Sequence, residues 1–551
     1  MDGVVDYRGR PVSRSAAGGW TSAFFIIGVE MAERFAYYGI TSNLISYLTG
    51  PLRESTAAGA ANENAWSGAA SSLALVGAFV ADSWLGRYRT VLYSSIVSFA
   101  GLGLLTLSAT LPSLKPPDCT VINGDSMSCP QPSTFQVIFF FMSLYLVALA
   151  HGGHKPCTQA FGADQFDNTD PLESASRSSF FNWWYFGVCT GTITAQLILN
   201  YIQDNMGWAL GFGIPCIAMG LALVAFLSGT RTYRYHIVAT ESPFVRITEV
   251  FGEVLRKKWA CFTSKTDDAR EMLLPDKSNQ CGPLDHKAGV SCIEPHVSFP
   301  SKKMSEDEVK GLARLFPIWT TCLIYTLVFS QPPTLFTKQG STMERHIGSG
   351  FQIPAAALQA CIGITTVTFI PIYDFLLVPV ARKFTGRPSG ITMLQRIGTG
   401  IFLSVVSTIV AALVEMKRLK VARDYGLVDM PNVPVPMSIW WLAPQNVLFG
   451  ISDAFATVGL QEFFYDQVPD CLRSLGLALY LCIFGLGRFL SSFLISLIDR
   501  LTGGREKGWF ANNLNRAHLD YFFWLLTGLG FASFVIYLHV ARLYIYKKKL
   551  T

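Results

Sequence analysis

The chain has 551 residues and a net charge of +6, and only 15% of its residues are charged, against about 25% in soluble globular proteins. Half of the residues are hydrophobic, and Phe alone contributes 40. These values exclude a disordered chain, a coiled coil, a collagen and a small disulfide scaffold, and they indicate a membrane protein. Because the net charge is small for this length and forms no basic stripe, we expect no nucleic-acid partner.

The polar N-terminal segment has no apolar core of the kind that a cleavable signal peptide requires, so we expect none. Most of the 12 cysteines lie in apolar runs, where Cys behaves as a small hydrophobic residue. Cys119 and Cys129 instead share one polar loop. They form a disulfide if that loop faces an oxidising compartment and stay free if it does not.

A helix that crosses a bilayer needs about 20 mostly apolar residues. Twelve segments of this kind occur, so the sequence predicts an all-α membrane protein with twelve transmembrane helices. The segments are 20–48, 66–85, 90–111, 134–156, 180–201, 207–229, 309–331, 350–376, 391–415, 437–464, 473–498 and 519–545. Trp and Tyr occur near many of their ends, as in an interfacial belt.

The long polar gap at 230–308 divides the twelve segments into six and six. We therefore expect a tail at 1–19, a six-helix bundle at 20–229, a linker at 230–308, a second six-helix bundle at 309–545 and a tail at 546–551. Within the linker, 243–262 has helical periodicity with basic residues on one side. This segment is either an interfacial amphipathic helix or a linker helix with a solvated face.

The distribution of Lys and Arg gives the expected orientation. Both termini lie on one side because the number of spans is even. The basic linker favours placing that side, and both tails, in the cytoplasm. The membrane is expected to be the plasma membrane or the vacuolar membrane.

The first span carries polar residues at helical spacing. Glu30, Glu33 and Arg34 are followed by Tyr37 and Tyr38. At 3.6 residues per turn these side chains form one stripe. Charges near the bilayer centre are costly and are functional candidates by default. Two carboxylates and one guanidinium leave one carboxylate in excess, and a dry site favours a bound proton on it. An ion-pair patch that only locks helices together is the alternative.

The fourth span carries His151, His154 and Lys155 on one face. Lys155 is the expected partner of the excess carboxylate, which gives a two-state element that a proton can bias. Each histidine is expected to be a hydrogen-bonded packing residue. We expect no metal site, because no third ligand accompanies the two histidines.

Asp453 and Glu462 lie nine residues apart in the tenth span and so face opposite ways. We expect Glu462 to face a central cavity and Asp453 to take part in helix packing. Arg488 in the eleventh span requires a carboxylate neighbour or a watery cavity. The sequence leaves Glu462, Asp453 and solvent open as its partner.

The loop GAFVADSWLGRYRT (77–90) contains Asp82, Arg87 and Arg89, which can form a charge clasp between helix ends. The clasp is a gate if it opens and a tight turn if it does not. The sequence contains no Walker, zinc-protease or serine-hydrolase motif, so we predict neither an ATP-driven pump nor an enzyme.

Several motifs carry a family likeness. EMAERFAYYG (30–39) resembles the ExxER signature of the proton-coupled oligopeptide transporter family, and SFFNWWYFGVCTG (179–191) resembles its fifth-span signature. GAFVADSWLGRYRT resembles that family's version of the major facilitator loop. GGHKPCTQAFGADQFD, PIYDFLLVPVARKFTGRPSGITMLQRIG and VGLQEFFYDQVPD are similar to the plant nitrate/peptide transporter branch. The likeness covers nearly the whole chain. It implies the major facilitator fold, with two six-helix bundles, a midplane site and alternating access.

The resemblance also implies roles for single residues. It implies proton coupling at Glu30, Glu33, Arg34 and Lys155, and solute contacts from Arg34, Tyr37, Tyr38, Lys155, Asn182, Phe329 and Glu462. Thr90 lies where one nitrate-carrying member has a regulatory phosphothreonine, and an ordinary Thr at a helix start is the alternative. Phe329 replaces the histidine that this member uses for nitrate, so that route is not expected here. Arg488 replaces an expected small residue.

Together these features predict a proton-coupled symporter for a small anionic or zwitterionic solute, such as nitrate, a di- or tripeptide, or a plant metabolite or hormone. Its expected partners are the solute, protons and the lipid bilayer, and it needs no cofactor beyond the coupling proton. A pH-independent facilitator or exporter, and a solute sensor with little flux, are the alternatives.

Overall fold

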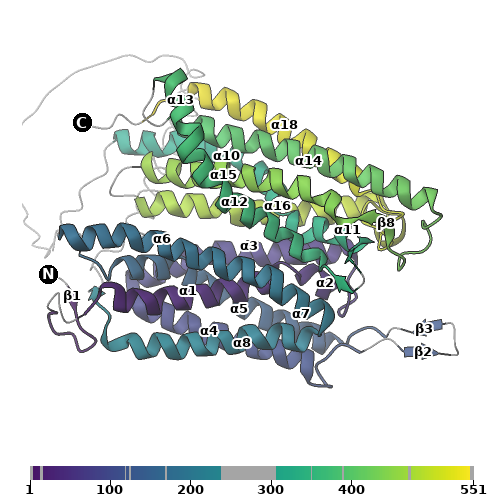
Figure 1. Ribbon diagram of the computed structural model, residues 1–551, viewed down its shortest axis with the longest axis horizontal. Helices are drawn as coiled ribbons and strands as arrows, with labels where there is room; N and C mark the ends of the chain where they lie inside the picture. Colours follow the sequence, from purple (N-terminus) through teal and green to yellow (C-terminus); the bar gives the residue numbers. More distant parts are fainter. Residues whose placement is uncertain are drawn as a thin grey trace, which may run out of the picture.

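The computed structural model describes residues 4–12, 17–117, 120–122, 126–128, 130–167, 170–236, 306–348, 350–386, 390–468 and 473–546. Cys119, Cys129 and the segment 243–262 lie outside these residues, so the disulfide and the amphipathic helix stay predictions. The described chain is an all-α membrane protein with the major facilitator fold. Its two halves lie side by side, and both termini are on the same face (Figure 1).

The first half contributes six helical stretches, four of them made of consecutive pieces. They are α1 (Gly19–Thr41) with α2 (Leu44–Thr49); α3 (Thr56–Val80) with η1 (Ala81–Leu85); α4 (Arg87–Thr110); α5 (Thr134–Ala163); α6 (Pro171–Thr194) with η2 (Ala195–Leu199) and α7 (Asn200–Asn205); and α8 (Trp208–Ser228), which runs into η3 (Gly229–Arg231).

The second half contributes six more. They are α10 (Glu306–Phe329) with η4 (Pro332–Phe336) and α11 (Thr337–Ser341); η5 (Ala355–Gln359) with α12 (Ala360–Ile372), η6 (Tyr373–Leu377) and α13 (Val378–Thr385); α14 (Met393–Asp424); η7 (Ile439–Leu442) with α15 (Ala443–Asp466); α16 (Arg473–Thr502); and α18 (Leu519–Leu543). A short helix, α17 (Gly504–Lys507), lies between the last two.

Each of the twelve predicted spans corresponds to one of these stretches. In the described part of the chain, nine helices are long and apolar enough to cross a membrane. The helix α1 is not among the nine because Glu30, Glu33 and Arg34 lie close together in its middle. A charge-based criterion therefore misses the helix that carries most of the predicted function.

Short two-stranded pairs occur only in the connections of the described chain. The antiparallel pairs are β1 (Val4–Val5) with β4 (Tyr235–His236), β2 (Thr120–Ile122) with β3 (Ser126–Ser128), and β6 (His346–Ile347) with β7 (Phe351–Gln352). β5 (Met343–Glu344) pairs in parallel with β8 (Val435–Ser438). The first pair holds the N-terminal segment against the end of the first half.

The helix α3 begins ten residues earlier than the predicted span at 66–85. The Ser55 hydroxyl caps it by accepting a hydrogen bond from the Ala58 amide at 3.1 Å. Its first turns, TAAGAANEN, are too polar to count as an apolar span, but four alanines and one glutamate favour a helix there. This earlier start places Glu63 inside the helix rather than in a loop.

The two halves contact one another most closely where α3 crosses α16. A Cβ added to Gly68 would lie 3.1 Å from the Gly485 carbonyl oxygen, and one added to Gly485 would lie 2.3 Å from the Ser72 hydroxyl. Small residues at a crossing allow two helix backbones to approach closely. This contact brings side chains of α3 within reach of side chains of α16.

The halves are also joined on the face remote from the termini (Figure 1). Lys338 Nζ donates to Thr49 Oγ1 at 3.0 Å, and Gln359 Nε2 donates to the Ser42 carbonyl at 2.8 Å. A buried apolar cluster continues this contact, with Ile45, Ala57 and Ala60 from the first half and Leu335 and Phe336 from the second. The passage between the halves is therefore closed on this face.

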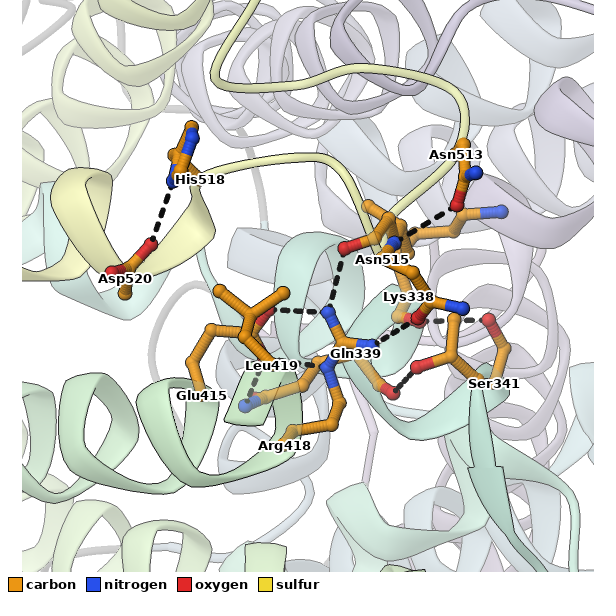
Figure 2. Close-up of polar contacts among 12 residues, drawn as sticks. Lys338, Gln339, Ser341, Glu415, Arg418, Leu419, Asn513, Asn515, His518 and Asp520 are labelled. Carbon is orange, nitrogen blue, oxygen red and sulfur yellow. Dashed lines mark hydrogen bonds and ion pairs between the residues drawn. The ribbon is translucent and has the colours of Figure 1, made fainter. Parts of the chain in front are cut away.

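A buried polar network holds the second half together near the same face (Figure 2). Arg418 donates to both oxygens of Glu415, at 2.6 and 2.9 Å, and both side chains are completely buried. Arg418 also donates to Asn515 Oδ1 at 2.8 Å, and Gln339 donates to Glu415 at 2.9 Å. The network connects α11, α14 and the loop before α18.

Candidate functional site

The polar stripe on α1 is buried inside the first half. Arg34 lies between the two carboxylates: it is 2.7 Å from Glu30 Oε1, and its Nε is 3.6 Å from Glu33 Oε2. The helical spacing predicted this neighbourhood, because residues three and four apart lie on one face. Two carboxylates and one guanidinium are therefore packed together away from solvent.

His151, rather than Lys155, is the side chain that α5 brings to this cluster. His151 Nδ1 lies 2.5 Å from Glu33 Oε1, and both side chains are buried. No carboxylate of the described chain lies within ion-pair distance of Lys155 in this structure, so the pairing of Lys155 with the excess carboxylate stays a prediction. His151 and Lys155 are four residues apart on one face, so spacing alone could not decide which of them reaches α1.

The cluster has the capacity to bind a proton. The contact of 2.5 Å between Glu33 and His151 is a short hydrogen bond between a carboxyl and an imidazole, two groups that can each bind a proton. In the described part of the chain, Glu30 Oε2 and Glu33 Oε2 are buried and have no hydrogen-bond partner. Buried carboxylate oxygens without a donor are unusual, so these two oxygens can accept a hydrogen bond from a donor that the cluster gains.

His154 has a packing role, as expected from the sequence. It hydrogen-bonds with the Ser95 hydroxyl at 2.9 Å and with Thr158 Oγ1 at 3.2 Å, and it is completely buried. These contacts tie α5 to α4. The two histidines thus have separate partners and do not converge on one point.

Tyr37 lies in the interior of the first half rather than in the cavity wall. Its ring stacks on His151 with centroids 3.8 Å apart and on Trp66 with centroids 5.4 Å apart. Trp66 is fixed in turn, because its Nε1 donates to the Leu144 carbonyl at 2.8 Å. Tyr37 is not part of the described cavity lining, so the expected solute contact stays a prediction, and in this structure its ring orients His151.

A cavity of about 280 Å³ lies between the halves near the middle of the helices. Its described lining comes from α1, α6, η2, η4, α10, η5, α12, α15 and α16. The polar and aromatic side chains of the wall include Tyr38, Thr41, Gln196, Phe329, Asp453 and Arg488.

The cavity contains two of the side chains expected to contact the solute, Tyr38 and Phe329. Arg34 and Lys155 are not part of its described lining, and the side chain of Asn182 lies outside the described residues. Arg34 is turned to the carboxylates behind the wall. The cavity and the charge cluster are thus neighbouring sites that share helix α1.

On α15 the structure reverses the predicted choice between two carboxylates. Asp453 lines the cavity and accepts a hydrogen bond from Thr457 at 2.5 Å. Glu462 is 47% exposed and lies 3.5 Å from Arg396. The two residues do face opposite ways, as nine residues of helix require. Helical spacing predicts that the two side chains point in opposite directions, but it does not predict which of them faces inward.

Arg488 has a carboxylate partner that sequence reasoning missed. Its Nη1 lies 3.6 Å from Glu63 Oε1, so the pair joins α16 of one half to α3 of the other. Neither Glu462 nor Asp453 forms this contact. The signal that could have found Glu63 was its position eight residues after Ser55, a residue that can cap a helix and would have extended the second span.

The predicted clasp on the face of the termini lies within the first half. Arg87 Nη1 contacts both oxygens of Asp164, at 2.6 and 2.7 Å, and its Nε lies 3.9 Å from Asp82. Arg89 is exposed. Thr90 is buried, and its hydroxyl donates to the Gly86 carbonyl at 3.0 Å. Gating and phosphorylation at these positions stay predictions.

A second contact on this face was not predicted. Arg234 donates to the two oxygens of Glu173 at 2.7 and 3.0 Å, and to the carbonyls of Gln165 and Ala17. The hydrogen bonds from Arg234 lower the pKa of Glu173 below its ordinary value. Arg234 thereby holds the N-terminal segment against the ends of α5 and α6.

Comparison with known proteins gives concordant matches. A sequence model of the POT family matches residues 88–510. The chain is 60% identical to Protein NRT1/PTR FAMILY 5.10 of Arabidopsis thaliana over 99% of this chain and 96% of that protein. It is also similar to the crystal structure of an auto inhibited POT family peptide transporter, with a TM-score of 0.69, 19% identity and coverage of 96% and 98%.

A third similarity is to the crystal structure of a peptide transporter POT variant in complex with alafosfalin. The TM-score is 0.65 at 16% identity, over 98% of this chain and all of that chain. At such identities the solved structures support the fold.

Proposed function

The chain belongs to the POT family of membrane transporters, and on that premise we propose that it is a proton-coupled symporter. It moves a small anionic or zwitterionic solute by alternating access around the cavity between its halves. Tyr38, Phe329 and Asp453 contact the solute, while the cluster on α1 binds the coupling proton.

The proposal depends most on the contact between Glu33 and His151. The hydrogen bond between these two titratable groups lies beside Arg34 and Glu30, in a cluster whose carboxylates have unused oxygens. The same helix gives Tyr38 and Thr41 to the cavity wall. A change of protonation at Glu33 therefore acts on the element that forms one wall of the solute site.

Alternating access requires one face to open as the other closes. In this structure the face remote from the termini is closed by the Lys338–Thr49 and Gln359–Ser42 contacts. If both termini are cytoplasmic, the state is inward-facing. Opening to the outside breaks these contacts, and Asp82, Arg87 and Arg89 form the inner gate.

A solved structure similar to this chain holds alafosfalin. We take this as support for a small organic solute in the cavity of the present chain. The solute does not have to be the same molecule, because one fold carries many substrates.

Uptake of a solute panel in oocytes, at acidic and neutral outside pH, tests the proposal. We expect at least one anionic or zwitterionic solute to enter faster at acidic pH, with an inward current if the coupled charge is net positive. Flux that is indifferent to pH would instead assign a facilitator. Binding without flux would assign a sensor. Either result would overturn the proposal.

A further inference from the structure

The described lining of the central cavity contains one basic side chain, Arg488, and one acidic side chain, Asp453. The other basic residue expected at the solute, Arg34, is engaged by two carboxylates behind the wall. A solute with a negative group therefore has Arg488 as its basic contact among these lining residues.

The guanidinium of Arg488 has unused hydrogen-bonding capacity. Arg488 is only 9% exposed, yet its Nη1 has no hydrogen-bond partner in the described part of the chain. Its distance of 3.6 Å from Glu63 is longer than a hydrogen bond, so the contact is electrostatic. A guanidinium carries five N–H donors in a planar fork that matches a planar oxyanion.

The position of this guanidinium is fixed from two sides. Its central carbon lies over the ring of Phe329, 5.7 Å from the centroid, which orients the planar group. Glu63 is completely buried on α3 and is held by a hydrogen bond of 2.8 Å from Ser67. Glu63 thus compensates the charge of Arg488 while Nη1 of the guanidinium keeps no hydrogen-bond partner among the described residues.

The rest of the wall indicates what kind of anion fits. Most of the cavity surface is apolar, with Val188, Ile193, Pro332, Pro333 and Phe449 among the lining residues. Apolar walls with a few placed polar groups are typical of sites for organic ligands. A nitrate ion would satisfy the guanidinium but leave these walls without a partner.

We infer that Arg488 binds the carboxylate of a small organic acid whose apolar part lies against the cavity wall. Glu63 is a positioning residue that competes with this carboxylate for the guanidinium. The inference rests on the proposed transport function, because it names the class of solute that the same cavity takes. The inference also explains why the side chain of Arg488 lies beside Phe329.

This arrangement predicts opposite effects for the two partners. Arg488→Gln removes the donor and weakens carboxylate binding by roughly 10- to 100-fold, the range expected when a hydrogen bond to a charged group is lost. Glu63→Gln removes the competing anion and strengthens the same binding. If the ion pair only held the two halves together, both substitutions would weaken that contact, and their effects on carboxylate binding would have the same sign.

The test uses the purified full chain in detergent and measures its thermal stabilisation by phenylacetate, by its neutral isostere phenylacetamide and by nitrate. A ligand that binds only the folded state raises the melting temperature in proportion to its affinity. We expect the largest shift with phenylacetate, a smaller one with nitrate and none with phenylacetamide. Arg423→Gln, an exposed arginine on α14, is the matched control and keeps the wild-type response.

Arg488→Lys provides a second variant in case Arg488→Gln does not fold. It keeps the charge but loses the planar fork, so the phenylacetate shift becomes smaller without disappearing. An unchanged phenylacetate response in both Arg488 variants would overturn the inference, as would weaker binding in Glu63→Gln. Equal stabilisation by phenylacetate and phenylacetamide, or by phenylacetate and nitrate, would do the same.

The two proposals can fail separately. If oocytes that express the wild-type protein show pH-driven uptake, but phenylacetate binding does not depend on Arg488, the anion site is wrong and the symporter proposal is retained. If no solute shows pH-driven uptake, but phenylacetate binding still depends on Arg488, the symporter proposal is wrong and the anion site is retained.

Discussion

Buried charges occur in both halves of the molecule, and the cluster on α14 is bonded differently from the cluster on α1. In the cluster on α14, both oxygens of Glu415 and the guanidinium of Arg418 have partners, including Gln339 and Asn515 (Figure 2). In the cluster on α1, Glu30 and Glu33 each retain a buried oxygen that has no hydrogen-bond donor in the described chain.

The difference separates structural from functional charge. A saturated pair gains nothing from an added proton and holds α11, α14 and a loop in place. An unsaturated cluster can gain a proton at little structural cost, and it sits on the helix that lines the solute cavity. Buried charge by itself therefore does not identify a coupling site; its unused hydrogen-bonding capacity does.

The largest expected effect on stability comes from the saturated cluster. Glu415→Gln leaves Arg418 as an uncompensated buried cation, and removing one partner of such a pair costs about 3–5 kcal/mol. Thermal unfolding of the purified protein measures this loss. Glu30→Gln, made in the unsaturated cluster, is expected to fold much closer to wild type. Equal destabilisation by the two variants would remove the distinction between the clusters.

The next largest effect concerns His151. His151→Gln keeps a hydrogen-bonding side chain next to Glu33 but removes the group that can share a proton with it. We expect pH-driven uptake to fall by about 10-fold or more, because a hydrogen bond to a charged group contributes roughly 1.5–3 kcal/mol. Uptake at several outside pH values measures the change. The same substitution at exposed His346, His346→Gln, should leave the pH profile as it is.

The two carboxylates of α15 give a smaller effect that sharpens the assignment of the cavity. Asp453→Asn is expected to raise the apparent KM for the solute by about 5-fold or more, the scale of one hydrogen bond. Glu462→Gln changes an exposed group and is expected to have little effect. Uptake measured over a range of solute concentrations gives the apparent KM of each variant. A larger rise in KM for Glu462→Gln than for Asp453→Asn would place Glu462, rather than Asp453, at the solute.

The smallest effect is expected at Glu173. Hydrogen bonds from Arg234 lower the folded-state pKa of Glu173 below the unfolded value of about 4.3. The stability contributed by this pair is therefore complete above that value and is lost as pH falls through the folded pKa. Glu173→Gln should reduce the loss of unfolding free energy between neutral and acidic pH by less than about 1 kcal/mol. Melting temperatures from neutral to acidic pH measure it, and an unchanged slope would contradict the assignment.

Local spacing predicted the parts of the site that lie on one helix. The offsets of Glu30, Glu33 and Arg34 determine one face whatever surrounds them, and the structure places them together. The fold class followed in the same way from twelve apolar segments and the matching motifs. The family resemblance is confirmed.

Contacts between helices could not be predicted in this way. His151 and Lys155 share a face of α5, and only the packing of α5 against α1 decides which one reaches Glu33. The choice between Asp453 and Glu462 depends likewise on how α15 is rotated. Glu63 and Arg488 are far apart in sequence and meet because Gly68 and Gly485 allow α3 and α16 to approach.

The measurement that tests the central claim most directly compares two modes of transport by Glu33→Gln in proteoliposomes. A solute found in the uptake panel is followed during accumulation driven by a pH gradient, and during solute exchange without a gradient. Glu344→Gln, which changes a partly exposed residue of β5, is the matched control. We predict that Glu33→Gln loses gradient-driven accumulation but keeps exchange, while Glu344→Gln keeps both. Gradient-driven accumulation at the wild-type level in Glu33→Gln would contradict the account.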